Sequence, residues 1–521
     1  MVARARSAVD QASLDRLILV GLVVLAAVLR FADLSTRGTW DADQGNDMLV
    51  LRALVTNGEL PLLGPPTSIG GFHHGVLYYY LLAPAAALSG ADPLWVVGAI
   101  ALAGVAAVAV TWWLARSIGG PVAGLVAGLL MAVSASAVDE STFIWNPNLI
   151  ALSSSVALAG AWRAWSSGRA RWWLVAAAGA IVTMHCHVLG SILLPAIAGL
   201  LVADIRRQGR GPARSARLGT AIAAAAMLAA SYVPLAIHEL TTEFSETRAA
   251  LDFIGGGGEP SALALPLRLV VVTLRVLAWP LSGLITDAPV AALFCSALVV
   301  AFVVWRSGAA SGPERTAARW FGLTLAWSVL ALTVAASGLT TVVRGLPNDH
   351  YHAFADPIVF VIVGLGAAAL CRWRPAAVAA PVGAIAAAGV VAALVVFNLA
   401  TLPPAVNPDG GWPAARAAAD RVLADTGMSD PIVLESLPVF KPPNALRFPL
   451  VASGAEVRVA GTDGTGPDGP RVVLCDDLFG TAIGAPCGGP AEDAAVTGLP
   501  LGVVDRFEAA PGRWFTVYLP R

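Results

Sequence analysis

Three carboxylates lie within seven residues of one another in the first polar stretch of the chain, Gly38–Tyr80. They are Asp41, Asp43 and Asp47, and they follow an apolar run that ends near Leu34. Acids this close raise one another's pKa, and such acids can take part in proton transfer. If a helix starts here, Asp43 and Asp47 share one face because they are four residues apart, which gives Asp47 a supporting role. Asp41 or Asp43 could instead cap that helix, or the acids could form a solvated surface.

The composition around this stretch is that of a membrane protein. Hydrophobic residues make up 57% of the chain and charged residues 13%, and the mean hydropathy is +0.72. Soluble domains carry roughly 25% charge. Apolar runs long enough to cross a bilayer as helices recur from Leu17 to Ala400. The first run has basic residues before it and no small-residue cleavage site after it, so we interpret it as a retained anchor and not as a signal peptide.

These runs predict an all-α polytopic membrane protein with about 11 to 13 transmembrane helices. We expect a cytoplasmic N-terminus at residues 1–16, a transmembrane domain at 17–400 and a separate C-terminal domain at 401–521. The polar stretch then forms a loop, residues 35–74, between the first two membrane helices.

The distribution of arginine predicts the orientation. Loops rich in arginine mark the cytoplasmic side of a membrane protein, and four such loops lie at residues 163–171, 206–217, 306–319 and 372–374. Between them alternate loops rich in acids, histidine and aromatic residues, at 35–74, 139–148, 238–260 and 339–352. We therefore expect a multi-pass protein of the plasma (inner) membrane, with the loop at 35–74 and the C-terminal domain outside the cytoplasm.

The C-terminal domain reads as a small α/β fold. The segment WPAARAAADRVLAD predicts a helix, and PIVLES, RVVLCDDLF and RWFTVYLP predict strands. Cys475 and Cys487 could form a disulfide outside the cytoplasm or could remain thiols. The net charge of −1 gives no indication of nucleic-acid binding.

The run WDADQGNDMLVLRALVTNGELPLLGPPTSIGGFHHGVLYYYLLAP resembles the first external loop of the GT-C superfamily of membrane glycosyltransferases, and in particular its family 39/PMT-like members. In that family an Asp-Glu or Asp-Gln pair follows the first membrane helix, as Asp43-Gln44 does here. A G-x-x-P-L-L-G-P loop and a G-P-L-Y-Y-Y helix entry come next. Residues 58–65 and 75–80 match them, except that Val76 stands where proline is usual.

Later segments resemble the same family in the same order, over residues 35–400. They are FIWNPNLIAL (143–152), MHCHVLGSILLP (184–195), YVPLAIHELTTEFSETRAALDFI (232–254) and NDHYHAFADPIVFVI (348–362). The resemblance implies a polyprenyl-phosphate sugar as donor and a glycan, lipid or protein as acceptor. It implies inverting transfer to an acceptor hydroxyl on the external face of the membrane.

The implied reaction needs a general base for the acceptor hydroxyl. By resemblance, Asp43 is the first candidate for this base and Asp41 the second. The reaction also needs cations where charge develops on the leaving phosphate. The external candidates are Arg52, Arg248 and Arg344, with His350 and His352 beside the last. We expect Asp43, Arg344 and His350 to meet at one external cavity.

Further substrate-binding candidates flank the proposed cavity: His73, His74, Tyr79, Glu239 and Tyr351. Each has an ordinary alternative. A histidine at a helix end is often only hydrogen-bonded, Tyr79 could belong to an aromatic belt at the membrane interface, and Glu239 could lie on a solvated helix face. Asp and His could bind a divalent metal ion as a cofactor, but no ligand spacing requires one, so we assign no metal ligands.

Two other functions are compatible with a polytopic membrane chain. A transporter or lipid flippase of the cell envelope usually places ionisable residues or broken helices at mid-membrane. Here the polar residues gather in loops and at helix ends, and the apolar runs are mostly Ala, Leu and Val. A non-catalytic scaffold for envelope assembly is the third interpretation, and it requires that the acids be dispensable.

Overall fold

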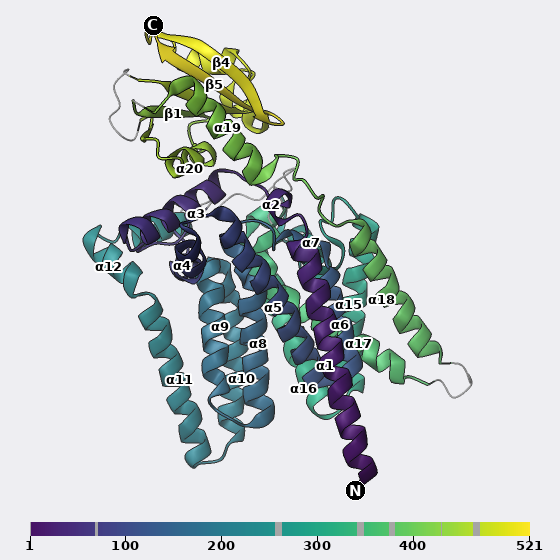
Figure 1. The fold of residues 1–521 in the computed structure, drawn as a ribbon. Coiled ribbons are helices and arrows are strands. Elements are labelled where there is room, and N and C mark those ends of the chain that lie inside the picture. The colour runs from purple at the N-terminus through teal and green to yellow at the C-terminus, as the bar shows by residue number, and fades with distance from the viewer. Residues whose placement is uncertain are drawn as a thin grey trace.

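The computed structural model describes residues 2–67, 71–255, 263–340, 349–374, 381–428, 430–461 and 469–521. It confirms the expected fold class, because a helical bundle extends to Ala400 and a small sheet follows near the C-terminus (Figure 1). The first half of the bundle contains α1 (Val2–Phe31), α2 (Leu34–Arg37), α3 (Ala42–Arg52), η1 (Ala53–Asn57), α4 (Leu77–Ser89), α5 (Pro93–Gly119), α6 (Pro121–Val133), α7 (Ala135–Asp139), η2 (Asn146–Leu149), α8 (Ile150–Ser167), α9 (Trp172–Cys186), η3 (Val188–Leu193) and α10 (Leu194–Arg207). The second half contains α11 (Pro212–Ser231), α12 (Val233–Thr241), α13 (Ser245–Gly255), α14 (Leu265–Ser282), α15 (Pro289–Ala309), α16 (Gly312–Ala335), η4 (Ser337–Thr340), η5 (Asp349–Ala355), α17 (Asp356–Arg372) and α18 (Val382–Ala400).

Seven helices in the described ranges are long and apolar enough to cross a membrane, or eight if the bent pair α11–α12 is one span. This is fewer than the 11 to 13 spans expected from the sequence. Three shorter apolar helices, α4, α6 and α9, belong to the same bundle, as do α1 and α8 (Figure 1). The bundle surrounds α17, whose apolar run is buried on nearly all sides, as expected for a helix without a polar face.

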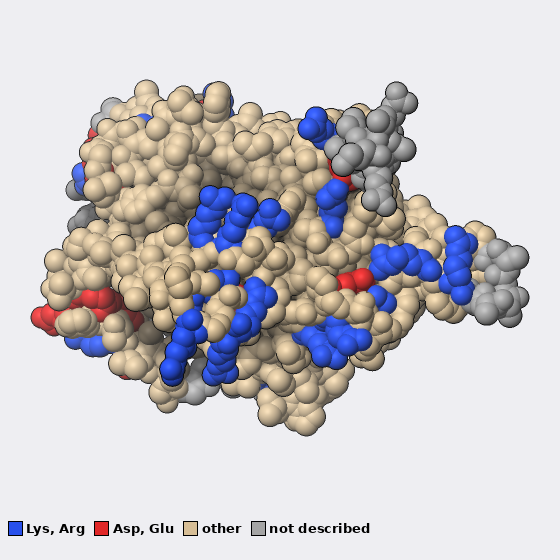
Figure 2. Space-filling view, turned by 90° about the horizontal axis from the view of Figure 1, so that it is seen from below, with Lys and Arg blue, Asp and Glu red and all other residues tan. Residues whose placement is uncertain are grey.

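Basic side chains gather on the end of the bundle that lies away from the C-terminal domain (Figure 2). Exposed arginines there come from helix ends and from the loops between helices: Arg169, Arg171, Arg206, Arg210, Arg315 and Arg372. These belong to the loops whose charge predicts the cytoplasmic side of the membrane.

The C-terminal domain sits on the opposite end, next to α2 and α3 (Figure 1). It contains α19 (Gly411–Thr426), β1 (Ile432–Leu437), α20 (Asn444–Ala452), β2 (Val457–Val459), β3 (Arg471–Asp476), η6 (Asp477–Phe479), α21 (Gly480–Ile483), α22 (Pro490–Ala495), β4 (Leu501–Ala510) and β5 (Arg513–Pro520). The strand order is β2-β1-β3-β5-β4, with β1 parallel to β2 and β3, and β5 antiparallel to β3 and β4. The predicted helix and three predicted strands are confirmed as α19, β1, β3 and β5.

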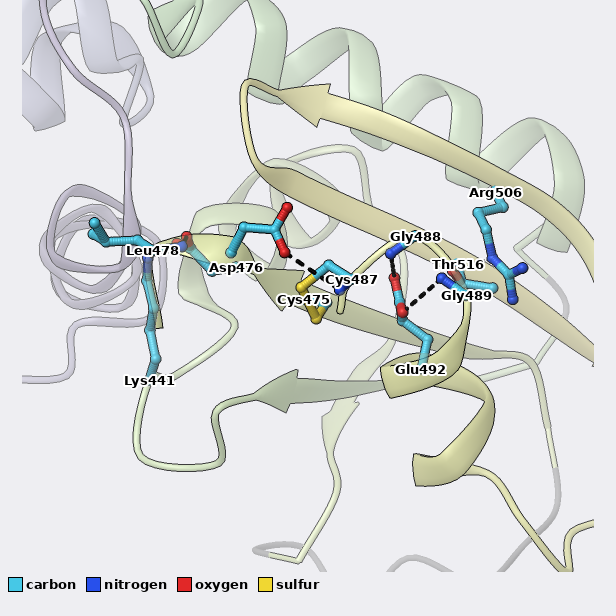
Figure 3. Close-up of a disulfide and its surroundings, with 11 residues drawn as sticks. Lys441, Cys475, Asp476, Leu478, Cys487, Gly488, Gly489, Glu492, Arg506 and Thr516 are labelled. Carbon is cyan, nitrogen blue, oxygen red and sulfur yellow. Dashed lines mark hydrogen bonds and ion pairs between the residues drawn. A yellow bond between two sulfur atoms is a disulfide. The ribbon is translucent and has the colours of Figure 1, made fainter. Parts of the chain in front are cut away.

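Cys475 and Cys487 form a disulfide, which resolves the alternative left open by the sequence (Figure 3). The bond joins the end of β3 to the loop before α22. In that loop the buried Glu492 accepts the backbone N–H groups of Gly488 and Gly489 at 2.9 and 3.0 Å. The disulfide and this carboxylate together fix the loop against the end of β3.

Candidate active site

Asp41 is the N-cap residue of helix α3, and its side chain and backbone form a capping box with Gln44. The Asp41 carboxylate accepts the backbone N–H of Ala42 at 2.7 Å, and the Asp41 N–H donates to Gln44 Oε1 at 2.8 Å. Such pairing satisfies donors that a helix N-terminus otherwise leaves without partners. Capping, one of the alternatives for the three acids, therefore applies to Asp41. Asp43 follows in the first turn of α3.

The bundle holds α3 through buried polar contacts. Gln44 Nε2 donates to the carbonyl of Ile144 at 2.8 Å. The buried Asp47 accepts the hydroxyl groups of Tyr78 and Tyr79 at 2.8 and 2.9 Å. Both tyrosines lie in the first turn of α4, so the Asp47 carboxylate ties α3 to the helix that follows the loop.

The loop between α3 and α4 is fixed against α9. The N–H of Gly75 donates to the carbonyl of His185 at 3.0 Å. A Cβ atom at Gly75 would lie 2.0 Å from Nδ1 of His185, so a larger residue does not fit there. His74, the preceding residue, is thereby held beside the end of α9.

A cavity of about 590 Å³ opens next to α3. Its polar lining consists of Asp43, Asn46, Asp47, Thr67, His74, Asn146, His187, His350 and Tyr351. Its apolar and aromatic lining consists of Pro65, Pro66, Phe72, Trp145, Pro147, Val188, Leu189, Phe253, Ile254, Ala335, Ala336, Phe440 and Pro442, together with Gly338. The described lining contains no arginine or lysine, so histidine is the only basic residue type on it.

The two acids on the cavity wall, Asp43 and Asp47, differ in solvent exposure and in the groups that shift their pKa values. Asp43 is reachable by solvent although protein surrounds it, as expected on a cavity wall. Burial and the charge of Asp41 raise the pKa of Asp43, while Lys441 and a hydrogen bond from Trp145 oppose the rise. Burial raises the pKa of Asp47 to about 7, against the hydrogen bonds from the two tyrosines.

Three histidines, His74, His187 and His350, lie together on the wall of the same cavity. Ring centroids are 4.7 Å apart for His74 and His187, and 5.2 Å apart for His187 and His350. Nδ1 of His74 accepts the N–H of Val188 at 3.3 Å, and Nδ1 of His187 accepts that of Leu189 at 3.2 Å. Because both Nδ1 atoms accept hydrogen bonds, each ring carries its proton on Nε2 when it is neutral. Burial and the charge of His73 lower the pKa of His74 to about 4.

Four of the residues predicted from the sequence line this cavity: Asp43, His74, His350 and Tyr351. Tyr79 does not line the cavity itself, but its hydroxyl donates a hydrogen bond to Asp47, which does. Asp43 and His350 both line this cavity, whereas Arg344, the third residue expected there, lies outside the described residues.

The other predicted residues lie away from the described lining. Asp41 binds Lys441 and Arg513 of the C-terminal domain. His73 pairs with Glu246, Nδ1 to Oε1, at 3.0 Å. His352 is buried and pairs with Asp356 at 3.1 Å.

Arg52, Glu239 and Arg248 also lie off the lining. Arg52 ends α3, nine residues or about 13 Å along the helix from Asp43. Glu239 is buried and accepts the N–H of Thr247 at 3.1 Å, so it joins α12 to α13 and does not lie on a solvated face. Arg248 is exposed beside Glu243, at 3.8 Å.

Sequence reasoning missed several residues of the cavity wall. His187, Trp145 and Asn146 lie in segments that already resemble the family, MHCHVLGSILLP and FIWNPNLIAL, so a signal was present for them. Phe440 and Pro442 come from the C-terminal domain, and no pattern in the sequence connects them to the loop at 35–74.

The described parts of the chain contain no group of three or more His, Cys, Asp or Glu side chains that could hold a metal ion.

Comparisons with known proteins agree with the motifs. Residues 73–238, less than half of the chain, match the family described as dolichyl-phosphate-mannose-protein mannosyltransferase. A search of curated proteins found no match. Among solved structures, ArnT from Cupriavidus metallidurans in the apo state is 14% identical, with a TM-score of 0.59 over 96% of this chain and 97% of that one. The same protein bound to undecaprenyl phosphate is 15% identical, with a TM-score of 0.60 over the same shares.

An oligosaccharyltransferase from Archaeoglobus fulgidus, tethered to an acceptor peptide, is more distant. It is 14% identical, with a TM-score of 0.46 over 85% of this chain and 63% of that one. The fold shared with ArnT along nearly the whole chain, and the family match within it, confirm the resemblance seen in the motifs. The chain therefore has the fold of ArnT, and within that fold residues 73–238 match the dolichyl-phosphate-mannose-protein mannosyltransferase family.

Proposed function

We propose that the protein transfers a sugar from a polyprenyl phosphate to an acceptor hydroxyl, with inversion at the anomeric carbon and with Asp43 as general base. One observation carries the choice of base. Asp41 is held by two cations and Asp47 by two tyrosine hydroxyls, whereas Asp43 opens into the cavity.

The reaction is a single displacement. The acceptor oxygen forms a bond to the anomeric carbon, and the bond from that carbon to the phosphate oxygen breaks. The proton of the acceptor hydroxyl passes to Asp43, and the leaving polyprenyl phosphate takes the bonding electron pair. A base placed within hydrogen-bond reach of the hydroxyl contributes about 10²- to 10⁴-fold to such a step.

The donor fits the composition of the cavity wall. Apolar side chains from η3, α13 and the end of α16, such as Leu189, Phe253 and Ala335, offer a surface for a prenyl chain. The ArnT structure that shares this fold was solved with undecaprenyl phosphate bound. The Nε2–H groups of His74 and His187 are donors suited to the leaving phosphate, and Arg344 remains the expected cation for it.

The side of the membrane is proposed on two grounds. Exposed arginines gather at the end of the bundle away from the cavity, which is the cytoplasmic end under the positive-inside rule (Figure 2). The disulfide in the C-terminal domain suits an oxidising compartment. Alkaline phosphatase fused after Arg521 should be active, and green fluorescent protein fused there should be dark. The reverse pattern would contradict an extracytoplasmic C-terminal domain.

Transfer can be tested in membranes that contain the full-length protein and native acceptors. The probes are radiolabelled undecaprenyl-phosphate hexoses and pentoses, offered one at a time. We expect transfer from at least one donor, its loss in Asp43→Asn at equal protein level, and full activity in Glu59→Gln, an exposed acid of the same loop. Full activity of Asp43→Asn would refute the base assignment, and retention of the anomeric configuration in the product would refute the single displacement.

Binding can be tested separately with undecaprenyl phosphate alone and detergent-solubilised protein. We expect the lipid to raise the melting temperature of the wild type and of Asp43→Asn by a similar amount, because a base acts on the acceptor and not on the lipid. An Asp43→Asn protein that no longer responds to the lipid would place Asp43 in donor binding instead.

A further inference from the structure

The C-terminal domain reaches the start of α3 through a group of four charges. Lys441 Nζ lies 3.0 Å from Asp41 Oδ2, and Arg513 Nη2 lies 3.0 Å from Asp41 Oδ1. Lys441 also binds Asp476, and Arg513 Nη2 is 3.8 Å from the same carboxylate. Lys441 and Asp476 lie beside the disulfide (Figure 3). Both cationic side chains are only 15% exposed, so this group is shielded from solvent far more than an ordinary surface ion pair.

Backbone contacts surround the charges. Trp40 Nε1 donates to the carbonyl of Ala445 at 2.9 Å, and Arg513 Nη1 donates to the carbonyl of Trp40 at 3.1 Å. A Cβ atom at Gly45 would lie 2.0 Å from the carbonyl oxygen of Asn444, so α3 and α20 touch at backbone distance. The C-terminal domain therefore contacts α3 and the residue before its N-cap through side-chain and backbone atoms.

The same segment of the domain closes the cavity. Phe440 and Pro442 line it, and Lys441 between them turns to Asp41. Asp41 is the N-cap residue of α3 and Asp43 lies in the first turn, so contacts that fix Asp41 also fix the start of the helix that directs the Asp43 side chain.

We propose that Lys441 and Arg513 are positioning residues for the transfer reaction, which hold α3 through Asp41 so that Asp43 faces the bound acceptor. The proposal rests on the proposed function, since it gives the C-terminal domain a part in that reaction. It assigns no direct contact with substrate to Lys441 or Arg513.

The charges around Asp43 predict the direction in which each substitution shifts the activity–pH profile. The charged and titratable groups around Asp43 are Asp41 at the N-cap of α3, Asp47 on α3, Tyr79 on α4, Lys441 from the domain, and His74, His187 and His350 on the wall of the same cavity. Asp41 raises the pKa of Asp43 and Lys441 lowers it. Removing Lys441 should therefore move the acid limb of the activity–pH profile to higher pH, whereas removing the charge of Asp41 should move it to lower pH, although both changes break the same ion pair.

The experiment compares Lys441→Met, Lys441→Arg, Asp41→Asn and Arg513→Met with Arg458→Met, which removes an exposed ion pair of the same domain. We expect Lys441→Met and Arg513→Met to lower kcat about tenfold while the donor KM changes less than about threefold. The acid limb should move by about half a pH unit in opposite directions for Lys441→Met and Asp41→Asn. Lys441→Arg should recover most of the activity, because it keeps the charge.

Two outcomes would overturn the proposal. In one, Lys441→Met and Arg513→Met match Arg458→Met in kcat and pH profile. In the other, Lys441→Met and Asp41→Asn move the acid limb in the same direction, which would indicate general loss of structure.

A second readout needs no substrate. Lys441 is the only lysine of the chain, so acetylation by an N-hydroxysuccinimide ester can be followed at one side chain by peptide mass spectrometry. We expect slower acetylation in the wild type than in Asp41→Asn or Asp476→Asn, because each variant removes a carboxylate that holds Nζ. Equal rates would refute the interdomain contact. If the wild type transfers no sugar, the proposed function fails, and the acetylation rates still decide the contact.

Discussion

The two sides of α3 use the same residue type for different purposes. On the side of the C-terminal domain, Asp41 is paired with Lys441 and Arg513. On the cavity side, Asp43 and Asp47 have no arginine or lysine beside them among the described lining residues. The helix α3, of 11 residues, thus carries two cavity acids, and the docking acid is the N-cap residue directly before it.

The difference lies in partners and not in burial. Burial alone would raise the pKa of Asp41, but the charges of Arg513 and Lys441 outweigh it and the pKa falls below its usual value of 3.8. Burial raises the pKa of Asp43, and the neighbouring charge of Asp41 adds to the rise. An acid that is permanently charged suits an ion pair, whereas an acid with a raised pKa suits proton exchange.

The largest loss of activity should come from substituting Asp43, the acid on the cavity side of α3. We expect Asp43→Asn to lower kcat about 10³-fold, because the proposed base is lost, and Asp41→Asn to lower it about tenfold, because only the position of that base is disturbed. Initial rates at the pH optimum of each variant measure this. A larger loss in Asp41→Asn than in Asp43→Asn would reverse the roles assigned to the two sides.

The next largest effect should come from removing the disulfide of Cys475, the residue next to Asp476 on the domain side. Cys475→Ser with Cys487→Ser opens a loop whose ends are 12 residues apart. We expect about 3 kcal/mol less stability for the C-terminal domain, seen as a lower-temperature unfolding transition. Cys371→Ser, at a free cysteine of α17, should leave that transition unchanged. Loss of undecaprenyl phosphate binding in the double variant would show that the domain supports the cavity side as well.

Adding one methyl group at Gly45 should force apart the surfaces of α3 and α20, which touch there. In Gly45→Ala the new Cβ meets the backbone of Asn444, which cannot move as a side chain could. We expect a loss of about 1 to 3 kcal/mol and faster acetylation of Lys441. Gly98→Ala in α5 is the control, since nothing lies within 4 Å of its added Cβ. If both variants behave alike, the close contact of α3 with α20 is not a constraint.

Local patterns in the sequence were enough for the bundle and for the cavity side of α3. The apolar runs became helices, and the four-residue spacing of Asp43 and Asp47 placed both on the cavity wall. His74, His350 and Tyr351 were also found, because they flank helix ends that carry motifs of the family.

The domain side could not be predicted, because its contacts join residues that are distant in the chain. Asp41 looked like a candidate base, but its partner Lys441 lies 400 residues away. Strands β2 and β4 were missed for local reasons. The first has three residues, and the pairing of the second is interrupted by register shifts, so neither has a clear alternation.

The smallest effect should be a loss of stability on removing the Tyr79 hydroxyl, which binds Asp47 on the cavity side of α3. The pKa of Asp47 is raised to about 7, so its contribution to stability is complete below the unfolded value of 3.8 and is lost as pH rises through 7. The hydroxyl of Tyr79 favours the charged form and limits that loss. We therefore expect Tyr79→Phe to cost about 1 kcal/mol at pH 8 and less at pH 5, measured as melting temperatures at both values.

Tyr80→Phe is the matched control for this change. Its hydroxyl donates to the carbonyl of Pro61 at 2.6 Å, and a carbonyl does not titrate, so its cost should be the same at both pH values. The pH dependence in Tyr79→Phe isolates the charge on Asp47 from the loss of a hydrogen bond as such. A cost for Tyr79→Phe that is equal at pH 5 and pH 8 would mean that Asp47 keeps one protonation state across this range. The cavity side would then have Asp43 as its one titrating acid.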